Sequence, residues 1–269
     1  GKMAIKHDIR RYLDNLEYQI DLLKNEGLKT VFNTEIKPDD VINRYDVVLC
    51  CSGLKVNTPS IEGLEQIRYN DVRDFLNQDM QLPDDVENVL VVGGGVIGCE
   101  VGYSLAYEKD INVTIVGKNK ELLPDTVLAN RSQMLWMMMG KGSPSGKEKD
   151  VLKKPINVYN ASEVVKFGKG KAYIKANKDR KDPYTPWKAL IPENVNNPFE
   201  KALDSDNVEE LVIETDFVIF AFGGKPDDTL YYELLKENAA KEIYSLGDSK
   251  EHGRVWDAVT CANEVARNI

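Results

Sequence analysis

A glycine-rich turn between an apolar run and a helical pattern constrains the fold more than any other feature. Gly93, Gly95 and Gly98 give the spacing GxGxxG, directly after the apolar run 88–92 and before a helix expected over 99–109. In this context the first glycine permits a tight turn, the second lets the backbone approach a pyrophosphate, and the third lets helix and strand pack closely. Phosphates then lie at the helix N-terminus, where unpaired N–H groups favour anions. The motif predicts a dinucleotide site formed by Gly93, Gly94, Gly95, Val96, Ile97 and Gly98. A glycine-rich turn without a ligand is the alternative.

The end of the next expected strand, 112–116, bears on which dinucleotide binds. An acid usually takes the ribose hydroxyls of NAD about 20 residues after the glycine motif. This sequence has Gly117 there, followed by Lys118 and Lys120. Lysines pair with a 2′-phosphate, which favours NADPH. A glycine turn with surface lysines is the alternative.

Strands and helices alternate along much of the chain, which predicts an α/β fold with a parallel sheet. Apolar residues at helical spacing indicate a first helix over 8–26, and Pro, Asn and Asp are frequent over 177–207. Further strands are expected at 29–33, 45–51, two or three within 156–176, 214–222 and 243–246, and further helices at 70–78, 126–139 and 256–268, with a helical turn at 39–42 and a linker at 82–85.

Two segments outside the glycine motif share one sequence pattern. Tyr45–Gly53 and Thr215–Gly223 each contain an acid, a β run, a small residue and a glycine. A third segment, Ile243–Asp248, ends in Gly-Asp and is followed by the last expected helix. These segments together resemble the flavoproteins in which an FAD domain is interrupted by an NAD(P) domain. The resemblance implies that Asp248 holds the ribityl chain of FAD and that the helix near Ala258 and Val259 stabilises the anionic reduced flavin. A plain turn aspartate is the alternative for Asp248. The cofactor-binding residues expected in these segments are Ser52, Gly53, Gly223, Gly247, Asp248, Ala258 and Val259.

Within that group, the residues from Ile9 to Gly63 and the block GGGVIGCE resemble the C-terminal half of the 2-enoate and 2,4-dienoyl-CoA reductases, relatives of trimethylamine dehydrogenase. The resemblance covers about 1–139 and 208–269, and 140–207 departs from it as an apparent insertion. It implies a Rossmann-like doubly wound parallel sheet for NAD(P) at 86–224. This domain is inserted in a second, N-terminally truncated FAD-type Rossmann-like domain at 1–85 and 225–269. FMN and a 4Fe-4S cluster are expected only in an N-terminal barrel of the same parent protein.

Composition excludes several classes of protein. The chain has 35 Lys and Arg against 44 Asp and Glu, a net charge of −9, whereas nucleic-acid binders normally show a basic footprint. No apolar run approaches the ~18 residues of a membrane span, and no signal peptide pattern opens the chain. The four cysteines show no metal or redox spacing, which favours a reduced, cytoplasmic setting. The chain begins with Gly1 rather than Met, which indicates a fragment.

No residue stands out as a catalytic acid, base or nucleophile. The histidines are His7 and His252, and His252 is expected to face solvent in a loop. Hydride transfer between stacked cofactors needs no such residue, because the protein supplies orientation and electrostatics. The expected function is hydride transfer from NAD(P)H to FAD in an enoate or dienoyl-CoA reductase-like flavoenzyme. The alternative is a non-catalytic domain that holds ADP structurally, as in trimethylamine dehydrogenase.

Overall fold

The computed structural model describes residues 3, 9–57, 59–143, 146–147, 151–185 and 203–269. The chain forms two compact units, each made of segments that are distant in the sequence. Unit 1 comprises residues 1–14 and 59–222, and unit 2 comprises residues 15–58 and 223–269.

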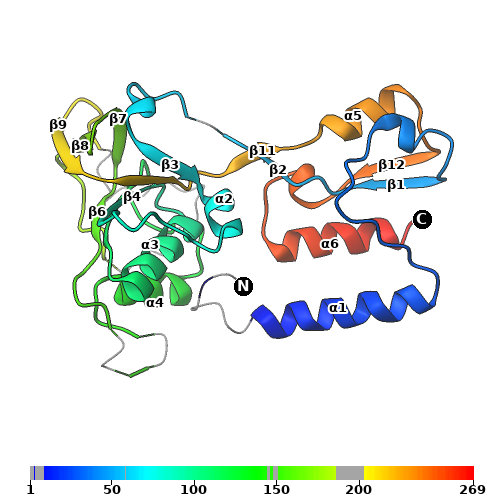
Figure 1. Ribbon diagram of the computed structural model, residues 1–269, viewed down its shortest axis with the longest axis horizontal. Coiled ribbons are helices and arrows are strands. Elements are labelled where there is room, and N and C mark those ends of the chain that lie inside the picture. Colours follow the sequence, from blue (N-terminus) through cyan, green and yellow to red (C-terminus); the bar gives the residue numbers. More distant parts are fainter. Residues whose placement is uncertain (1–2, 4–8, 58, 144–145, 148–150, 186–202) are drawn as a thin grey trace. The chain divides into compact units, whose positions relative to one another are not determined.

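Unit 1 is built on a five-stranded parallel sheet with the strand order β3-β10-β4-β5-β6 (Figure 1). A helix follows three of these strands. The strands are β3 (Arg68–Asp71), β4 (Asn88–Val92), β5 (Asn112–Val116), β6 (Asn157–Tyr159) and β10 (Phe217–Phe220), and the helices are α2 (Val72–Asn77), α3 (Val96–Lys109) and α4 (Leu128–Met138). The expected α/β fold with a parallel sheet is confirmed.

The strands alternate their side chains between two cores, as the period of a β-strand requires. Val89 and Val91 of β4 pack with helix residues such as Tyr103 in one core, whereas Leu90 packs in a second core with Phe167. The second core lies under a three-stranded antiparallel sheet with the order β7-β8-β9. Its strands are β7 (Ser162–Gly168), β8 (Lys171–Asn177) and β9 (Val208–Glu214). An antiparallel sheet thus covers the face of the parallel sheet where a doubly wound fold would place helices.

The expected insertion at 140–207 contains strands that are built into unit 1. β6 joins the parallel sheet, and β7 and β8 join the antiparallel sheet, in agreement with the two or three strands expected within 156–176. Residues 186–202 of this segment lie outside the described residues.

Unit 2 contains two small sheets, and two of the described α-helices lie wholly within it. β1 (Val47–Cys50) pairs in parallel with β12 (Glu242–Ser245), and β2 (Leu54–Val56) pairs antiparallel with β11 (Gly224–Pro226). The helices are α5 (Thr229–Lys236) and α6 (Val255–Ala266). Its buried apolar core consists of Val41, Cys50, Leu234 and Ala239.

The division between the units differs from the sequence-based boundaries at 85/86 and 224/225, because residues 1–14 and 59–85 belong to unit 1 and residues 223–224 to unit 2. β3 in the segment 59–85 pairs with β10, and the backbone N–H of Phe167 donates a hydrogen bond of 2.8 Å to the carbonyl of Glu62. A Cβ on Gly63 would lie 2.1 Å from the carbonyl oxygen of Phe167, so this segment packs closely on β7.

The expected strand at 29–33 is wrong. The segment is irregular, and the side chains of Val31 and Phe32 are 74% and 77% exposed. A short apolar run becomes a strand only where another strand accepts its backbone hydrogen bonds, and none of the described residues pairs with this one.

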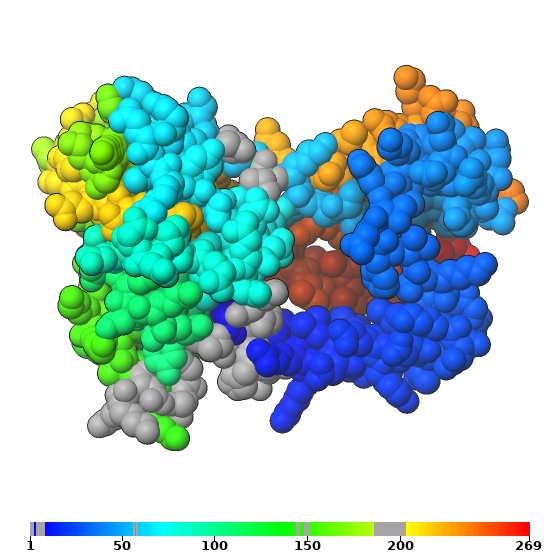
Figure 2. All heavy atoms as spheres, in the orientation of Figure 1, coloured from blue at the N-terminus to red at the C-terminus, as the bar shows by residue number. Residues whose placement is uncertain are grey.

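The expected first helix is confirmed as α1 (Ile9–Asn25), which carries no buried residue. Its apolar side chains are each about two-fifths or more exposed, among them Tyr12, Leu13, Leu16 and Leu23, and the helix is the dark blue segment at the surface in Figure 2. No helix among the described residues has the length and apolarity needed to cross a membrane.

Candidate dinucleotide site

The glycine-rich turn connects the carboxyl end of β4 to the N-terminus of α3. Gly93 has φ +130°, a conformation that side chains rarely adopt, and a Cβ on it would lie 2.3 Å from the carbonyl oxygen of Ala221. A Cβ on Gly98 would lie 2.1 Å from the carbonyl oxygen of Gly93. Both positions therefore require glycine for the fold itself, independently of any ligand.

Gly95 differs from these two glycines because no atom lies within 4 Å of the position that its Cβ would take. Its φ of −76° and ψ of −177° suit any residue. The space beside Gly95 is therefore open. Open space at a helix N-terminus lets a pyrophosphate approach the backbone.

The first turn of α3 has the electrostatics that an anion needs. Gly95 is the N-cap residue, so no side chain caps the helix, and the first turn contains no acidic residue. The first backbone N–H groups of a helix lack intrahelical partners and carry the positive end of the helix dipole. Val96 and Ile97 are 38% and 46% exposed, so solvent reaches this turn.

Residues of α3 and of the loop after β5 hold the turn in place through hydrogen bonds to the carbonyl of Gly94. The backbone N–H of Leu123 donates to the carbonyl of Gly94 at 2.8 Å, and the Cys99 thiol donates to the same oxygen at 3.6 Å. Burial, with a smaller effect of the Glu100 carboxylate, raises the pKa of Cys99 to about 12. Cys99 is therefore a neutral packing residue and not a nucleophile.

The end of β5 lies directly against this turn. The backbone N–H of Gly93 donates to the carbonyl of Val116 at 2.8 Å, and a Cβ on Gly117 would lie 3.2 Å from the nitrogen of Gly94. Lys118 is 80% exposed and forms an ion pair with Glu163, Nζ to Oε2, at 3.2 Å. Glu163 could not be predicted from the sequence, because only the pairing of β5 with β6 brings it beside Lys118.

The two strands that follow the glycines of the two similar segments, β2 and β11, pair with one another in unit 2. Gly53 and Gly223, with φ of +81° and +75°, immediately precede β2 and β11, which pair with one another. Ser52 donates its hydroxyl to the carbonyl of Asp227, and the Asp227 N–H donates to the carbonyl of Gly53 at 2.8 Å. Lys55 forms an ion pair with Asp227 at 3.0 Å. The residues expected to bind a cofactor here, Ser52, Gly53 and Gly223, thus lie beside the first residues of the two-stranded ribbon β2-β11.

The Gly-Asp segment forms a compact turn after β12. Gly247 has φ +60°, and a Cβ on it would lie 3.4 Å from the Cβ of Ala258, so α6 packs closely on this turn. Asp248 accepts a hydrogen bond of 3.0 Å from the backbone N–H of Gly253. Its carboxylate is 3.8 Å from the exposed ring of His252. One carboxylate oxygen of Asp248 therefore stabilises the loop, whatever else the group binds.

The start of α6 is open to solvent on one side. Val259 is 44% exposed, and the N-cap residue, Arg254, donates its backbone N–H to the carboxylate of Asp257 at 2.7 Å. Asp257 thus caps the first turn. Ala258 and Val259 follow it within the second turn, where the helix dipole is weaker than at the N-cap.

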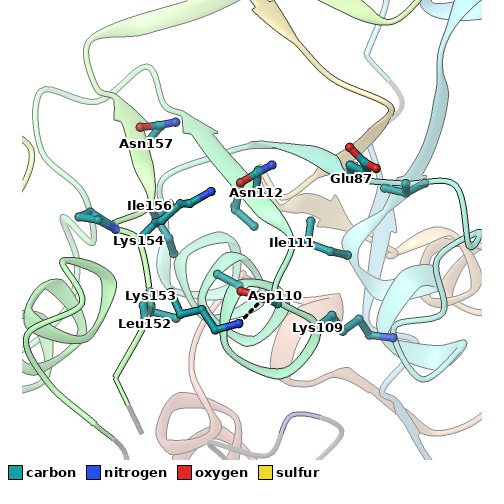
Figure 3. Close-up of a pocket in the computed structure, with 14 residues that line it drawn as sticks. Glu87, Lys109, Asp110, Ile111, Asn112, Leu152, Lys153, Lys154, Ile156 and Asn157 are labelled. Atoms are coloured by element: carbon teal, nitrogen blue, oxygen red, sulfur yellow. Dashed lines mark hydrogen bonds and ion pairs between the residues drawn. The ribbon is translucent and has the colours of Figure 1, made fainter. Parts of the chain in front are cut away.

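A cavity of about 850 Å³ lies at the opposite end of the parallel sheet (Figure 3). Glu87, Asn112 and Asn157 line it at the amino ends of β4, β5 and β6, and Asp110 in its wall pairs with Lys153. The glycine-rich turn follows the carboxyl end of β4, so this cavity is not the dinucleotide site. Among the described residues, no group of three or more His, Cys, Asp and Glu side chains is placed to hold a metal ion.

A parallel sheet with a GxGxxG turn leading into a helix defines a Rossmann-type nucleotide-binding fold. The model of the pyridine nucleotide-disulphide oxidoreductase family matches residues 4–250, and the chain belongs to this family. Membership implies an oxidoreductase that binds a pyridine nucleotide and a flavin.

Individual relatives agree with the resemblance found in the sequence. Cinnamate reductase of Clostridium sporogenes is 24% identical over 252 residues, which are 92% of this chain and 30% of that protein. The structure of 2-naphthoyl-CoA reductase in complex with 2-naphthoyl-CoA matches with a TM-score of 0.73 at 20% identity, over 100% of this chain and 33% of that one. Histamine dehydrogenase from Rhizobium sp. 4-9 matches with a TM-score of 0.62 at 13% identity, over 90% of this chain and 33% of that one. The chain thus spans about a third of the length of these relatives.

Proposed function

We propose that this chain binds NAD(P)H on unit 1 and passes its hydride to FAD within an enoate or dienoyl-CoA reductase-like flavoenzyme. The observation that carries the proposal is the open space beside Gly95 at the start of α3. Two of the motif's glycines are required by packing, whereas the second leaves open the space that a pyrophosphate would fill. Family membership supports the redox role.

The residues of this chain bind and orient the nucleotide and move no proton. The bound nicotinamide supplies a hydride that a flavin accepts. The backbone N–H groups at the start of α3 hold the pyrophosphate, and Gly93 and Gly98 keep that helix close to β4. Gly117 and Lys118 border the place proposed for the adenosine ribose. This positioning is the protein's contribution to hydride transfer.

Unit 2 is proposed to contribute the flavin end of an FAD site. Asp248 at the end of β12 and the N-terminal half of α6 would hold the ribityl chain and the flavin ring, as the resemblance implies. The proposed partner is the N-terminal barrel of the parent protein, with FMN and a 4Fe-4S cluster. The share of the relatives that the chain spans, about a third, supports further domains in that protein.

Calorimetric titration of the chain with NADH, NADPH and ADP tests the proposal. We expect a reduced dinucleotide to bind more tightly than ADP, because a nicotinamide site adds contacts that ADP does not use. Gly95→Ala should weaken the binding of all three ligands, since its Cβ would occupy the space proposed for the pyrophosphate. Absence of any binding that is sensitive to Gly95 would contradict the proposal.

A second candidate is a structural ADP site without turnover. The observation in its favour is Gly117, which offers no side chain to the ribose at the position where an acid usually stands. In that case ADP would bind as tightly as NADH and NADPH, and the same titration would show it.

A further inference from the structure

A carboxylate from a different strand lies beside the end of β5, where the sequence offers only glycine and lysine. Glu163 of β7 forms the ion pair with Lys118 at 3.2 Å, and the two side chains are 47% and 80% exposed. The charge of Lys118, which the sequence alone assigns to a 2′-phosphate, is therefore already engaged by an acid of this chain.

Backbone hydrogen bonds fix the position from which Glu163 reaches Lys118. The N–H of Gly117 donates to the carbonyl of Tyr159 at 2.9 Å, and the N–H of Ser162 donates to the carbonyl of Gly117 at 3.0 Å. The N–H of Ala161 donates to the carbonyl of Asn119 at 2.8 Å. Glu163 is thus the next residue after one that is bonded directly to Gly117.

The buried side-chain amide of Asn160 also connects the turn before β7 to the segment after β5. Asn160, which is 1% exposed, donates its Nδ2 hydrogens to the carbonyls of Lys120 at 2.6 Å and Lys181 at 3.1 Å. Ala161, which follows it, has φ +45° and turns the chain sharply between β6 and β7. Buried hydrogen bonds of this kind define one geometry, because leaving the amide unpaired is costly. The register of Glu163 against the end of β5 is therefore well determined.

We infer that Glu163 sets the preference of this site between NADH and NADPH. This inference rests on the proposed function, which places the adenosine ribose at the end of β5. A 2′-phosphate there meets a lysine that is already paired with an acid, and a carboxylate of its own sign. Glu163, which lies on β7, thus discriminates between NADH and NADPH in place of the acid that usually stands at the end of the second strand. The preference for NADPH expected from Lys118 and Lys120 alone is correspondingly reduced.

The test compares Kd values for NADH and NADPH in the wild-type chain, Glu163→Gln, Lys118→Ala and the double variant. Glu163→Gln frees Lys118, so we expect the affinity for NADPH relative to NADH to rise about 3- to 10-fold at low salt. The gain should shrink as salt screens the charges. In the Lys118→Ala background, Glu163→Gln should change the ratio less than about twofold, because the charge pair no longer exists.

Asp110→Asn provides the matched control. It removes one exposed acid from one ion pair, at the far end of α3 (Figure 3), and asparagine suits the left-handed φ of 56° at this position. The ratio of the Kd values for NADH and NADPH should stay at the wild-type value in this variant. An unchanged ratio in Glu163→Gln, or an undiminished effect without Lys118, would overturn the inference while dinucleotide binding itself persists. If neither dinucleotide binds to the wild-type chain, the proposed function fails instead.

Discussion

Gly117 and Gly94 pack backbone against backbone, so that a Cβ on Gly117 would lie 3.2 Å from the nitrogen and 3.3 Å from the Cα of Gly94. Few real Cβ atoms make contacts this short. Gly94 has little room to move, because its carbonyl accepts the Leu123 N–H at 2.8 Å and a side chain on it would meet Leu122. Glycine at position 117 is therefore favoured by the packing of the turn, and its backbone remains open to a role in ribose recognition.

This contact changes what substitution of Gly117 should do. The sequence alone predicts that Gly117→Glu shifts the preference toward NADH by supplying the usual acid. The structure predicts an additional loss, because a side chain at position 117 would press on the backbone of Gly94. We expect Gly117→Ala, which adds no charge, to weaken ADP, NADH and NADPH about equally and several-fold, as measured by calorimetry. Unchanged affinities in Gly117→Ala would show that the turn tolerates the side chain.

Gly95 and Gly98 should separate binding from folding. Gly95→Ala places a methyl group in open space, so the free energy of unfolding should fall by less than about 1 kcal/mol, the cost of a poorer N-cap. Dinucleotide affinity should fall about 10- to 100-fold, because the contacts of the pyrophosphate with the backbone are lost. Urea unfolding and calorimetry on the same samples measure both effects.

Gly98→Ala is the complementary variant. Its Cβ would lie 2.1 Å from the carbonyl oxygen of Gly93, so α3 must move away from the turn. We expect a loss of stability of about 3 kcal/mol or more, as for severe overpacking. Equal stability of the Gly95→Ala and Gly98→Ala chains would contradict the different roles assigned to the two glycines.

The parts of this site that are local in sequence were predictable, and the parts that depend on strand pairing were not. The apolar run of β4, the glycine spacing and the helix after it lie within about 25 residues, and each carries its own periodicity. Glu163 carries no local signal, because only the alignment of β6 against β5 makes it a neighbour of Lys118. The segment at 29–33 failed for the converse reason, since it has the pattern of a strand but no described pairing partner. The compact units divide elsewhere than at the expected boundary of 85 because β3, whose sequence RYND lacks an apolar pattern, pairs with β10.

Cys99 should make the stability of unit 1 sensitive to high pH. Its pKa is raised from 9.0 to about 12 in the folded chain, so above pH 9 the unfolded chain releases a proton that the folded chain retains. The contribution of the neutral Cys99 thiol to the free energy of unfolding is fully present below pH 9 and is lost as the pH rises toward 12. Between these two pH values, the free energy of unfolding should fall by about 1.4 kcal/mol for each pH unit.

Urea unfolding at several pH values between 9 and 11 checks this slope. Cys99→Ala should reduce the slope, although the cavity it creates also lowers stability at every pH. Cys261→Ala is the control, because it removes a cysteine of α6 in unit 2. The same slope in Cys99→Ala and in the wild-type chain would show that the Cys99 thiol is not the group responsible.

Finally, we expect this chain alone to retain FAD weakly or not at all. Its single GxGxxG motif, at 93–98, lies in unit 1, so no second glycine-rich helix start is present to hold the pyrophosphate of FAD. Asp248 and α6 offer contacts to the flavin end only, and one oxygen of Asp248 is already engaged by the Gly253 N–H. After incubation with FAD and gel filtration, the absorbance at the flavin band should correspond to far less than one equivalent. Retention of one equivalent of FAD would show that unit 2 holds the flavin without a pyrophosphate turn, and it would contradict this prediction.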